Sequence, residues 1–453
     1  MSQDSPTSPP TDATARELPA FLRNLHRNLS FWVLTAGVAG YVCAVTFGDR
    51  TWPTMASPPE FYEFVLLLKD TFISALRLLV APVVFFSLLG GLLGLGDVTR
   101  LRKIGSVAIG YYVITTFIAI CIGLFVVTFI HPWESSGLQI SVDQLATTQV
   151  NSGDPPPVLI DPGSDSVVRI VRGMLNTALS NPFHALANLN ILAIVTNALL
   201  AGFALIMVVP KDSPLITGVH HVNAIISKVL TWILLFTPLG IFGIVFDFSL
   251  RAGGDLFSEL LAFSAVVFGA TMFHGLFVLP TLGWVLGRVH PLHFLRYAGA
   301  PLLVALTTSS SSAALPVTMK TCEENFGVSK GVSGFVLPLG ATMNMDGTAL
   351  FEGIAAVFLA HLFGIELTGF SLVAVFLMTV VSSVGAPGMP SGSISGMQMV
   401  MLAVGIPLEA IGILLVVERP LDTFRTAVNV EGDMIGALVT QRRLDIIEAR
   451  ASS

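Results

Sequence analysis

Polar and charged side chains gather in one segment near the carboxyl end of the chain, residues 418–433. If this segment is a helix that turns by about 100° per residue, its polar members share one face about 100° wide. They are Glu418, Asp422, Arg425, Thr426, Asn429 and Asp433, called the polar stripe below. A charged group in mid-membrane costs at least about 2.5–3.5 kcal/mol, so a stripe at that depth must face a polar cavity or a bound ligand.

The polar stripe has the donors and acceptors for a zwitterion that carries an additional carboxylate. Arg425 offers a planar fork for a carboxylate, and Asp422 can accept a hydrogen bond from an ammonium group. Thr426 and Asn429 add neutral hydrogen bonds, and Asp433 is left as an anionic ligand for a hard cation such as Na⁺. The alternative is an Asp422–Arg425 ion pair that only holds a bundle together, although buried ion pairs are a weak source of stability.

A second polar segment, residues 340–352, interrupts a long apolar run. Its Asn344-Met345-Asp346-Gly347 stretch should unwind a helix, since Gly and Asn favour non-helical backbone. Unwound carbonyls with the side chains of Asn344 and Asp346 would form an oxygen-rich nest for a cation; the alternative is a plain kink. Glu352 is either a proton carrier or a hydrogen-bond partner of a neighbouring group.

A serine-rich elbow, Thr307–Ser312, supplies hydroxyl groups and free backbone N–H groups that suit a carboxylate. The other interpretation is an intramembrane serine protease, which needs a base within reach of the serine. Neither this elbow nor a second Gly/Pro-rich elbow, residues 385–393, has a Gly-x-Ser-x-Gly pattern. His274, the nearest intramembrane histidine, has no obvious orienting acid. We therefore expect that the protein is not an enzyme.

The composition requires a lipid bilayer around these segments. Of the 453 residues, 53% are hydrophobic and 11% are charged, and the mean hydropathy is +0.80. Soluble domains carry about 25% charged residues, and disordered chains are less hydrophobic than this one. The net charge of −6 and the lack of a basic stripe exclude nucleic acid as a partner. Cys43, Cys121 and Cys322 show no metal spacing and no disulfide framework.

Long apolar runs with little period-2 alternation predict membrane-spanning helices, not barrel strands. Two runs, Phe294–Leu306 and Leu367–Val384, are short, and an apolar stretch resumes after the polar elbow that follows each. Two apolar arms joined by an elbow describe a re-entrant hairpin, whose irregular backbone must line an internal site. Paired interruptions indicate a transporter built on inverted repeats. We predict an all-α membrane protein with eight transmembrane helices and two re-entrant helical hairpins.

The distribution of basic residues predicts that both termini are cytoplasmic. The loop from His131 to Ser166 has no Lys or Arg and five acidic residues, so we expect it outside the cell. Arg442, Arg443 and Arg450 close the chain on the inside. The expected location is the cell membrane, plasma or inner, which the chain crosses several times.

These segments together resemble the glutamate transporter family, the dicarboxylate/amino acid:cation symporters that include the excitatory amino acid transporters and their prokaryotic relatives. The resemblance rests on the two elbows, on Asn344-Met345-Asp346-Gly347-Thr348 and on the spacing Arg425-Thr426-x₂-Asn429-x₃-Asp433. The run from Tyr111 to Thr116 is similar to a family segment that helps to bind sodium. The resemblance covers the chain from about residue 30 to residue 441.

The resemblance implies how an amino acid would be held. Its α-groups would lie near Ser310 and Ser311 of the first elbow and the Met389 carbonyl, with Asp422 on the ammonium and Asn429 on the α-carboxylate. Arg425 and Thr348 would hold the side-chain carboxylate. The expected substrate-binding residues are Ser310, Ser311, Thr348, Met389 (through its carbonyl), Asp422, Arg425, Thr426 and Asn429.

The resemblance also implies three sodium sites built from side chains and carbonyls. The expected ligands are Tyr112, Thr115, Thr116, Gly340, Thr342, Asn344, Met345, Asp346, Ser383, Val384, Asn429 and Asp433. Glu352 resembles the position that is tied to proton coupling in the excitatory transporters. Two departures from the family pattern, Pro387 and Ser393 in the second elbow, replace residues that are small in relatives, and Glu418 stands where relatives often have Asp.

The family architecture implies a homotrimer with a fixed scaffold and a transport domain that moves like an elevator. The expected divisions are a disordered cytoplasmic tail (1–30), scaffold helices 1 and 2 (31–102), transport-domain helix 3 (103–131), an extracellular loop (132–166), scaffold helices 4 and 5 (167–250), the rest of the transport domain (257–441) and a cytoplasmic tail (442–453). Within 257–441 we expect helix 6, hairpin 1 (about 294–326), helix 7 (about 332–363), hairpin 2 (about 367–403) and helix 8 (about 407–441).

The function implied by the resemblance is import of L-glutamate and/or L-aspartate, coupled to Na⁺ with H⁺ as an additional ion. Arg425 argues against the neutral amino acid relatives, which lack it, and Asp422 argues for an amino acid over a simple dicarboxylate. The alternatives are a proton-coupled glutamate or C4-dicarboxylate symporter and, as a different class, an anion channel.

Overall fold

The computed structural model describes residues 29–93, 105–130, 172, 175–176, 178–187, 190–210, 212–252, 255–367, 369–385, 393–406 and 410–451. Every regular element in these ranges is a helix, so the predicted all-α class is confirmed for the described chain. Most of the predicted N-terminal tail, the predicted extracellular loop and the tip of the second elbow, with Pro387 and Met389, lie outside the described residues.

The first half of the chain forms a group of helices that pack around α3 and α11. The elements are α2 (Leu29–Phe47), η2 (Trp52–Thr54), α3 (Glu60–Leu93), α5 (Ser106–Phe129), α8 (Pro182–Ala187), α9 (Ile191–Val208), α10 (Pro214–Leu235) and α11 (Thr237–Ala252). α11 packs closely on both α2 and α3, while α9 and α10 lie along α3. A Cβ atom on Gly243 would lie 2.8 Å from the Val65 carbonyl oxygen, so glycine permits this close approach of α11 to α3.

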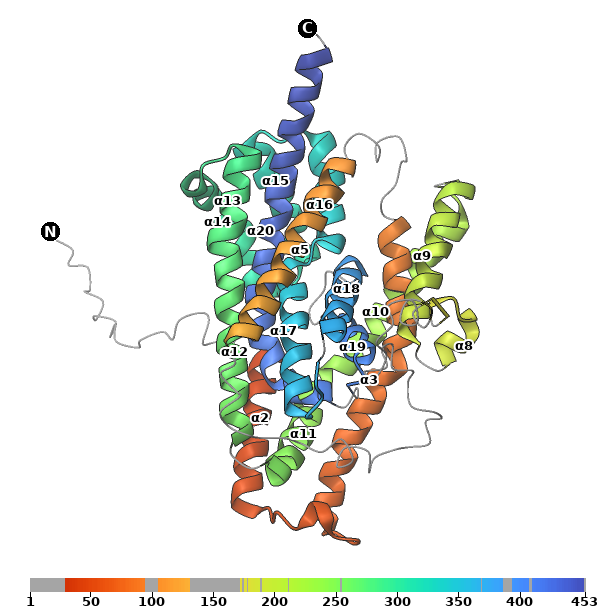
Figure 1. Ribbon diagram of the computed structural model, residues 1–453, viewed down its shortest axis with the longest axis vertical. Coiled ribbons are helices and arrows are strands. Elements are labelled where there is room, and N and C mark those ends of the chain that lie inside the picture. Colours follow the sequence, from red (N-terminus) through yellow and green to blue (C-terminus); the bar gives the residue numbers. More distant parts are fainter. Residues whose placement is uncertain are drawn as a thin grey trace, which may run out of the picture.

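The second half of the chain packs around α17 and α20. Its elements are α12 (Asp255–Phe273), η4 (His274–Val278), α13 (Leu279–Leu282), η5 (Gly283–Gly287), α14 (Pro291–Thr308), α15 (Ser311–Phe326), α16 (Lys330–Met343), α17 (Asp346–Leu362), α18 (Gly369–Gly385), α19 (Ser393–Ala403) and α20 (Ile411–Ala451). α5 belongs with this group in space, because it packs along α17 and α20. Figure 1 shows α20 rising through the middle of the molecule and projecting from its top to the C terminus.

Helix α20 is longer than the predicted helix 8. It has 41 residues and continues as a helix through 442–451, the segment predicted as a tail. Pro420 lies inside it, and most residues from Leu421 to Thr440 are buried. A helix buried on every side can carry both a polar stripe and an apolar face, each against a different neighbour.

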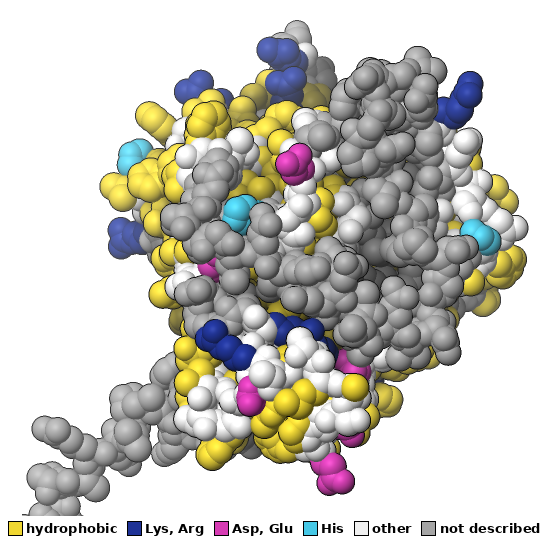
Figure 2. Space-filling model, turned by 60° about the horizontal axis from the view of Figure 1, so that its bottom comes forward, with side chains coloured by type: hydrophobic (Ala, Val, Ile, Leu, Met, Phe, Trp, Pro, Cys, Tyr) yellow, Lys and Arg dark blue, Asp and Glu magenta, His cyan; other side chains and the backbone are white. Residues whose placement is uncertain are grey.

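The outer surface is apolar, as expected for a chain in lipid. Hydrophobic side chains cover much of the described surface in Figure 2. Among the described residues, five helices are long and apolar enough to cross a membrane: 60–90, 106–129, 214–235, 257–287 and 330–362. The length and composition of these helices support a multi-pass membrane protein.

Candidate functional site

The predicted break in the apolar run at residues 340–352 is present. α16 ends at Met343 and α17 begins at Asp346, and between them Asn344 (φ −111°, ψ 78°) and Met345 (φ −109°, ψ 51°) leave the helical conformation. Both residues are buried. The break therefore exposes backbone carbonyls inside the protein, where lipid cannot satisfy them.

Asp346 is the centre of a buried hydrogen-bond network that joins three helices. Its Oδ1 atom accepts hydrogen bonds from Thr116 (2.7 Å) and Thr115 (3.3 Å) of α5. Its Oδ2 atom lies 3.3 Å from Nε2 of His274, the first residue of the π-helical turn η4. Our expectation that His274 lacks an orienting acid was wrong, since the fold brings Asp346 to it from 72 residues away. The two predicted threonine ligands do meet Asp346.

A second network lies around Asp433 of α20 and is joined to the break in the helix through Asn344. Asn344 donates through Nδ2 to Asp433 Oδ1 (3.0 Å), and a Cβ atom on Gly340 would collide with that same carboxylate oxygen. The Tyr112 hydroxyl lies 2.6 Å from the same position and donates to the Val336 carbonyl (2.9 Å). Glycine at position 340 therefore leaves room for oxygen atoms from α5, α16 and α20 to converge.

The chemistry of these oxygen atoms fits a small hard cation. No group of three or more His, Cys, Asp or Glu side chains in the described part of the chain is arranged to hold a metal. The oxygens around Asp346 and Asp433 instead come from carboxylate, amide, hydroxyl and carbonyl groups, the ligands that alkali and alkaline-earth ions take.

Thr342, Met345, Ser383 and Val384, expected above among the sodium ligands, are not joined to one another by hydrogen bonds in the described residues. Thr342 donates to the Leu339 carbonyl (3.0 Å) and Ser383 to the Val380 carbonyl (2.8 Å), so each hydroxyl is bonded within its own helix. Met345 does reach the polar stripe, because its sulfur accepts a hydrogen bond from Asn429 Nδ2 (3.3 Å). Val384 belongs to α18, but its side chain is outside the described set.

The amino end of α17 packs directly on the polar stripe. Asn429 Oδ1 accepts a hydrogen bond from Gly347 N (2.8 Å), and its Nδ2 donates to Thr348 Oγ1 (3.2 Å). A Cβ atom on Gly347 would lie 2.6 Å from the Arg425 carbonyl oxygen, so this contact requires glycine. The fold thus joins the two segments in which we predicted substrate and sodium binding.

Arg425 is completely buried, and only one of its nitrogens is hydrogen-bonded. Nη2 donates to Glu418 Oε1 (2.9 Å), to Asp422 Oδ1 (3.1 Å) and more weakly to Ser393 Oγ (3.3 Å). The guanidinium carbon lies 3.9 Å from the ring centre of Phe351, a cation–π contact. Nε and Nη1 are buried without a hydrogen-bond partner among the described residues.

The alternative interpretation of the stripe as an ion pair is thus partly realised, because Asp422 does pair with Arg425. The pairing leaves three N–H donors of Arg425 unused. A buried donor without a partner costs about 1–3 kcal/mol, so a group that merely holds the bundle would not be left in this state. Thr426 donates to the Asp422 carbonyl (2.8 Å) and lies beside this arrangement.

The serine-rich elbow separates two helices that pack along each other, α14 and α15. Ser309 adopts the left-handed conformation (φ 49°), and the Ser310 side chain caps α15 by accepting from Ala313 N (3.2 Å). Ser310 and Ser311 are both buried, and both helices contact α20. The elbow therefore lies against the helix that carries the polar stripe.

Glu352 is fully buried near the second elbow. Both carboxylate oxygens lack a hydrogen-bond partner among the described residues, as does the Ser382 hydroxyl. A Cβ atom on Gly396 of α19 would collide with both side chains, so Glu352 and Ser382 approach each other across this glycine. Burying an ionised carboxylate in this setting costs far more than burying its protonated form.

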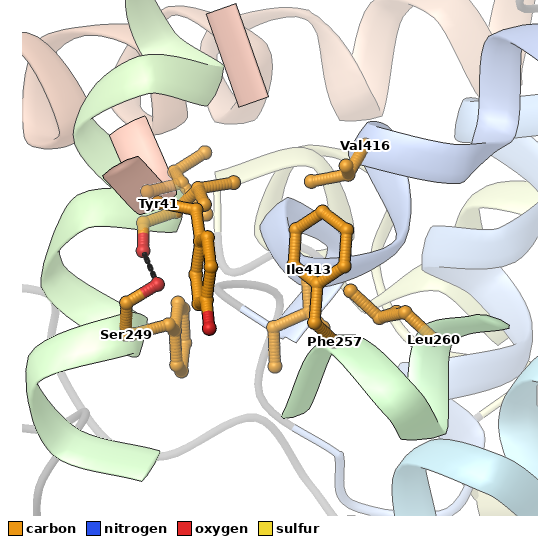
Figure 3. Close-up of a pocket in the computed structure, with 9 residues that line it drawn as sticks. Tyr41, Ser249, Phe257, Leu260, Ile413 and Val416 are labelled. Carbon is orange, nitrogen blue, oxygen red and sulfur yellow. Dashed lines mark hydrogen bonds between the residues drawn. The ribbon is translucent and has the colours of Figure 1, made fainter. Parts of the chain in front are cut away.

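Two cavities in the described part of the chain lie away from the polar stripe. One is enclosed by α2, α11, α12 and the start of α20, with Tyr41, Phe257 and Val416 in its wall (Figure 3). Its volume of about 10 Å³ matches a single water molecule. Another, of about 560 Å³, is an open apolar groove between α3 and α8. Neither includes a predicted site residue.

The profile of the sodium:dicarboxylate symporter family matches residues 29–443, nearly the whole chain. The chain belongs to this family. Among curated proteins, the symporter is 31% identical over 441 residues to the neutral amino acid transporter B(0) of Homo sapiens, covering 92% of this chain and 79% of that protein. It is 30% identical over 470 residues to the excitatory amino acid transporter 2 of Homo sapiens, with coverage of 92% and 80%. The Caenorhabditis elegans protein named "Putative sodium-dependent excitatory amino acid transporter glt-4" is 30% identical over 440 residues.

These comparisons confirm the family resemblance and the expectation that the symporter is not an enzyme. They support a multi-pass membrane protein that transports an amino acid together with a cation. Relatives named for neutral and for excitatory amino acids match almost equally well, so overall similarity does not decide between these substrates.

Two contacts of Arg425 in the symporter were missed by the sequence analysis. Ser393 was noted only as a departure from the family pattern, and Phe351 was not considered. Both come from other helices, 32 and 74 residues away, and neither has a local signal in the sequence. To identify them, one would have to know which helices pack against the polar stripe, and the periodicity of the sequence does not give this information.

Proposed function

We propose that the symporter imports L-glutamate and/or L-aspartate, driven by Na⁺ with H⁺ as an additional coupled ion. The observation that carries this proposal is the incomplete bonding of Arg425, whose Nε and Nη1 are buried and unpartnered. Nε and Nη2 form one bidentate edge of the guanidinium, and Nη1 and Nη2 form another. A carboxylate at either edge would accept a hydrogen bond from the unpartnered nitrogen and would displace or share a partner of Nη2. An apolar side chain would leave these donors unpaired, and a neutral amide could not match the charge of the guanidinium.

The other substrate groups follow from the same region. Asp422 accepts the α-ammonium, Asn429 donates to the α-carboxylate, and Thr426 and Thr348 add hydrogen bonds. Ser310, Ser311 and the Met389 carbonyl complete the proposed enclosure from the two elbows. A ligand held by both elbows and α20 is enclosed on several sides, which favours an import cycle with a closed intermediate.

Sodium ions bind at the networks of Asp346 and Asp433 in this proposal, with Thr342, Met345, Ser383 and Val384 forming a further site. Asn429 bonds to the amino end of α17, and Asn344 bonds to Asp433, so substrate and cation ligands share the same two helices. This sharing supports coupling, because each ligand can favour the conformation that binds the other. Glu352 carries the proton.

The proposed assembly is a homotrimer in the cell membrane with both termini in the cytoplasm. Each subunit has eight spans and two re-entrant hairpins, α14–α15 and α18–α19. The scaffold comprises residues 31–102 and 167–250, and the transport domain, 103–131 and 257–441, moves as an elevator. The packing of α5 with α17 and α20, and of α2 with α11, supports this division.

Uptake into proteoliposomes tests the substrate assignment. With a sodium gradient, the wild type should accumulate labelled glutamate or aspartate, while Arg425→Cys should lose at least about thirtyfold in affinity, since truncating a buried charge partner costs about 2–5 kcal/mol. Arg442→Gln, at the far end of the same helix, is the control. Wild-type glutamate affinity in Arg425→Cys would refute the assignment.

The same assay separates the alternatives. A proton-coupled glutamate or C4-dicarboxylate symporter would concentrate substrate with a pH gradient alone, and succinate would then compete with glutamate. An anion channel would not concentrate any substrate above equilibrium. Varying Na⁺, pH and the competing solute in one series distinguishes all three.

A further inference from the structure

The outer side of the helical stretch 257–287 is a continuous apolar surface that ends in an aromatic and a basic residue. Phe273 is 50% exposed, Phe277 62% and Trp284 55%. Arg288 follows at once and is exposed, and it ends the helix in the left-handed conformation (φ 60°). A tryptophan at the end of an apolar surface is typical of the membrane–water boundary.

The next helix, α14, carries an exposed arginine on an otherwise apolar face. Leu292 is 72% exposed and Leu303 is 61% exposed, and Arg296 lies on the same face at helical spacing. Arg296 is five residues beyond Pro291, about 8 Å along the helix at about 1.5 Å per residue. An arginine at this depth on a lipid-facing surface extends its guanidinium back to the headgroup layer.

Neither arginine has a carboxylate partner within ion-pair distance among the described residues. The Arg296 guanidinium makes a cation–π contact with Tyr297, at 5.8 Å from the ring centre. A third arginine, Arg442 of α20, donates to the Leu286 carbonyl (3.3 Å) at the same end of the molecule. This end, where α13 and α14 lie, is the one from which the C terminus projects (Figure 1).

We propose that Trp284, Arg288 and Arg296 bind an anionic phospholipid from the surrounding bilayer. The two guanidinium groups hold the headgroup phosphate, for which the planar arginine fork is well suited. The acyl chains lie on the apolar faces of 257–287 and α14, and the Trp284 ring sits at the boundary between headgroup and chain. The apolar surfaces beside the two arginines favour a lipid over a free phosphate ion, which would gain nothing from them.

Quenching of Trp284 by brominated lipid tests this proposal at the site itself. Trp32, Trp52, Trp133 and Trp232 are replaced by Phe, and variants that retain uptake are reconstituted in phosphatidylcholine with rising fractions of brominated phosphatidylglycerol. We expect phosphatidylglycerol to be preferred beside Trp284, and Arg288→Gln and Arg296→Gln each to reduce that preference about fivefold, since a basic residue near the surface contributes about 1 kcal/mol. Arg50→Gln, an exposed arginine in the segment between α2 and α3, should leave it unchanged.

A second reporter and a second method keep the proposal falsifiable. A variant with Trp232 as its single tryptophan, also 55% exposed, should show no preference for phosphatidylglycerol. Native mass spectrometry of the otherwise unmodified protein should show retained phosphatidylglycerol that is lost in the Arg288→Gln/Arg296→Gln double variant. Equal preference at both tryptophans, unchanged preference in the arginine variants, or full competition by millimolar inorganic phosphate would each overturn the proposal.

Discussion

Arg425 illustrates how a buried charge can serve a ligand and still be tolerated in its absence. One nitrogen is held by Glu418 and Asp422, and the ring of Phe351 covers one face of the guanidinium. The carboxylates of Glu418 and Asp422 both contact the guanidinium, so Arg425 is not buried as an isolated charge. In the proposed function, an anionic solute replaces or shares one of these carboxylates at the same guanidinium.

Asp433 is the residue for which the sodium hypothesis makes its sharpest prediction. Asp433→Asn keeps the shape of the side chain and its capacity to hydrogen-bond Asn344, but it removes the negative charge. We expect the sodium concentration for half-maximal uptake to rise by at least about tenfold, because even outer-shell changes at metal sites cost about 10–100-fold. The measurement is initial uptake against sodium concentration at saturating substrate.

A matched control for Asp433→Asn lies on the same helix. Asp445→Asn removes an equal charge from an exposed position of α20 three turns farther on, and its sodium dependence should equal that of the wild type. If Asp433→Asn also kept the wild-type sodium dependence, Asp433 would not be a ligand.

At the scale of elements, the features that could be predicted from the sequence are those that depend on residues close together in the chain. The break at Asn344 and Met345 follows from residues that disfavour a helix, and the shared face of the polar stripe follows from periodicity alone. The sequence did not predict the His274–Asp346 contact or the π-helical turn in which His274 lies. These features depend on which helices become neighbours, and a single sequence does not show which distant segments pack together.

The contact between α3 and α11 is a second feature that only the fold reveals. Asp247 is fully buried and accepts hydrogen bonds from Lys69 Nζ (2.8 Å), Arg251 Nε (2.9 Å) and the Tyr62 hydroxyl. Lys69 lies where Gly243 lets the two helix backbones approach closely. One carboxylate therefore bridges two cations where the two helices pack closely.

Removing Asp247 should destabilise this helix pair more than removing Lys69. Asp247→Leu removes the carboxylate that both Lys69 and Arg251 contact, which should cost about 3–5 kcal/mol. Lys69→Met leaves Asp247 with Arg251 and Tyr62 and should cost less, and the double variant should recover part of the loss. Thermal unfolding in detergent gives the order of stability. Additive losses in the double variant would contradict direct coupling of the two residues.

At the scale of the whole molecule, the two groups of helices meet along α2. Gly37 of α2 faces α20, where its Cβ position lies 3.2 Å from Val416 Cγ1, and Tyr41 packs its ring against Phe257 of α12 (5.1 Å between centres). The cavity of Figure 3 lies along this boundary. Three positions later, Gly40 faces α11 instead, with its Cβ position 3.3 Å from Val245 Cβ. One helix therefore contacts the proposed scaffold and the proposed transport domain on adjacent turns.

This arrangement allows the elevator to be tested with two disulfides that share α2. In a background without Cys43, Cys121 and Cys322, oxidation of Gly37→Cys/Val416→Cys should join the two proposed domains and stop uptake, and reduction should restore it. Gly40→Cys/Val245→Cys joins helices within the scaffold and should leave uptake intact, with α2 and α11 moving apart slightly because a Cβ atom at position 40 lies 2.7 Å from the Phe242 carbonyl oxygen. The Cβ positions of Gly40 and Val245 are 3.3 Å apart, just below the separation of about 3.5–4.5 Å typical of a disulfide, and the Gly37 Cβ position lies 3.2 Å from Val416 Cγ1. Full uptake with the first pair completely oxidised would mean that α20 does not move relative to α2, and the proposed domain boundary would then have to be abandoned.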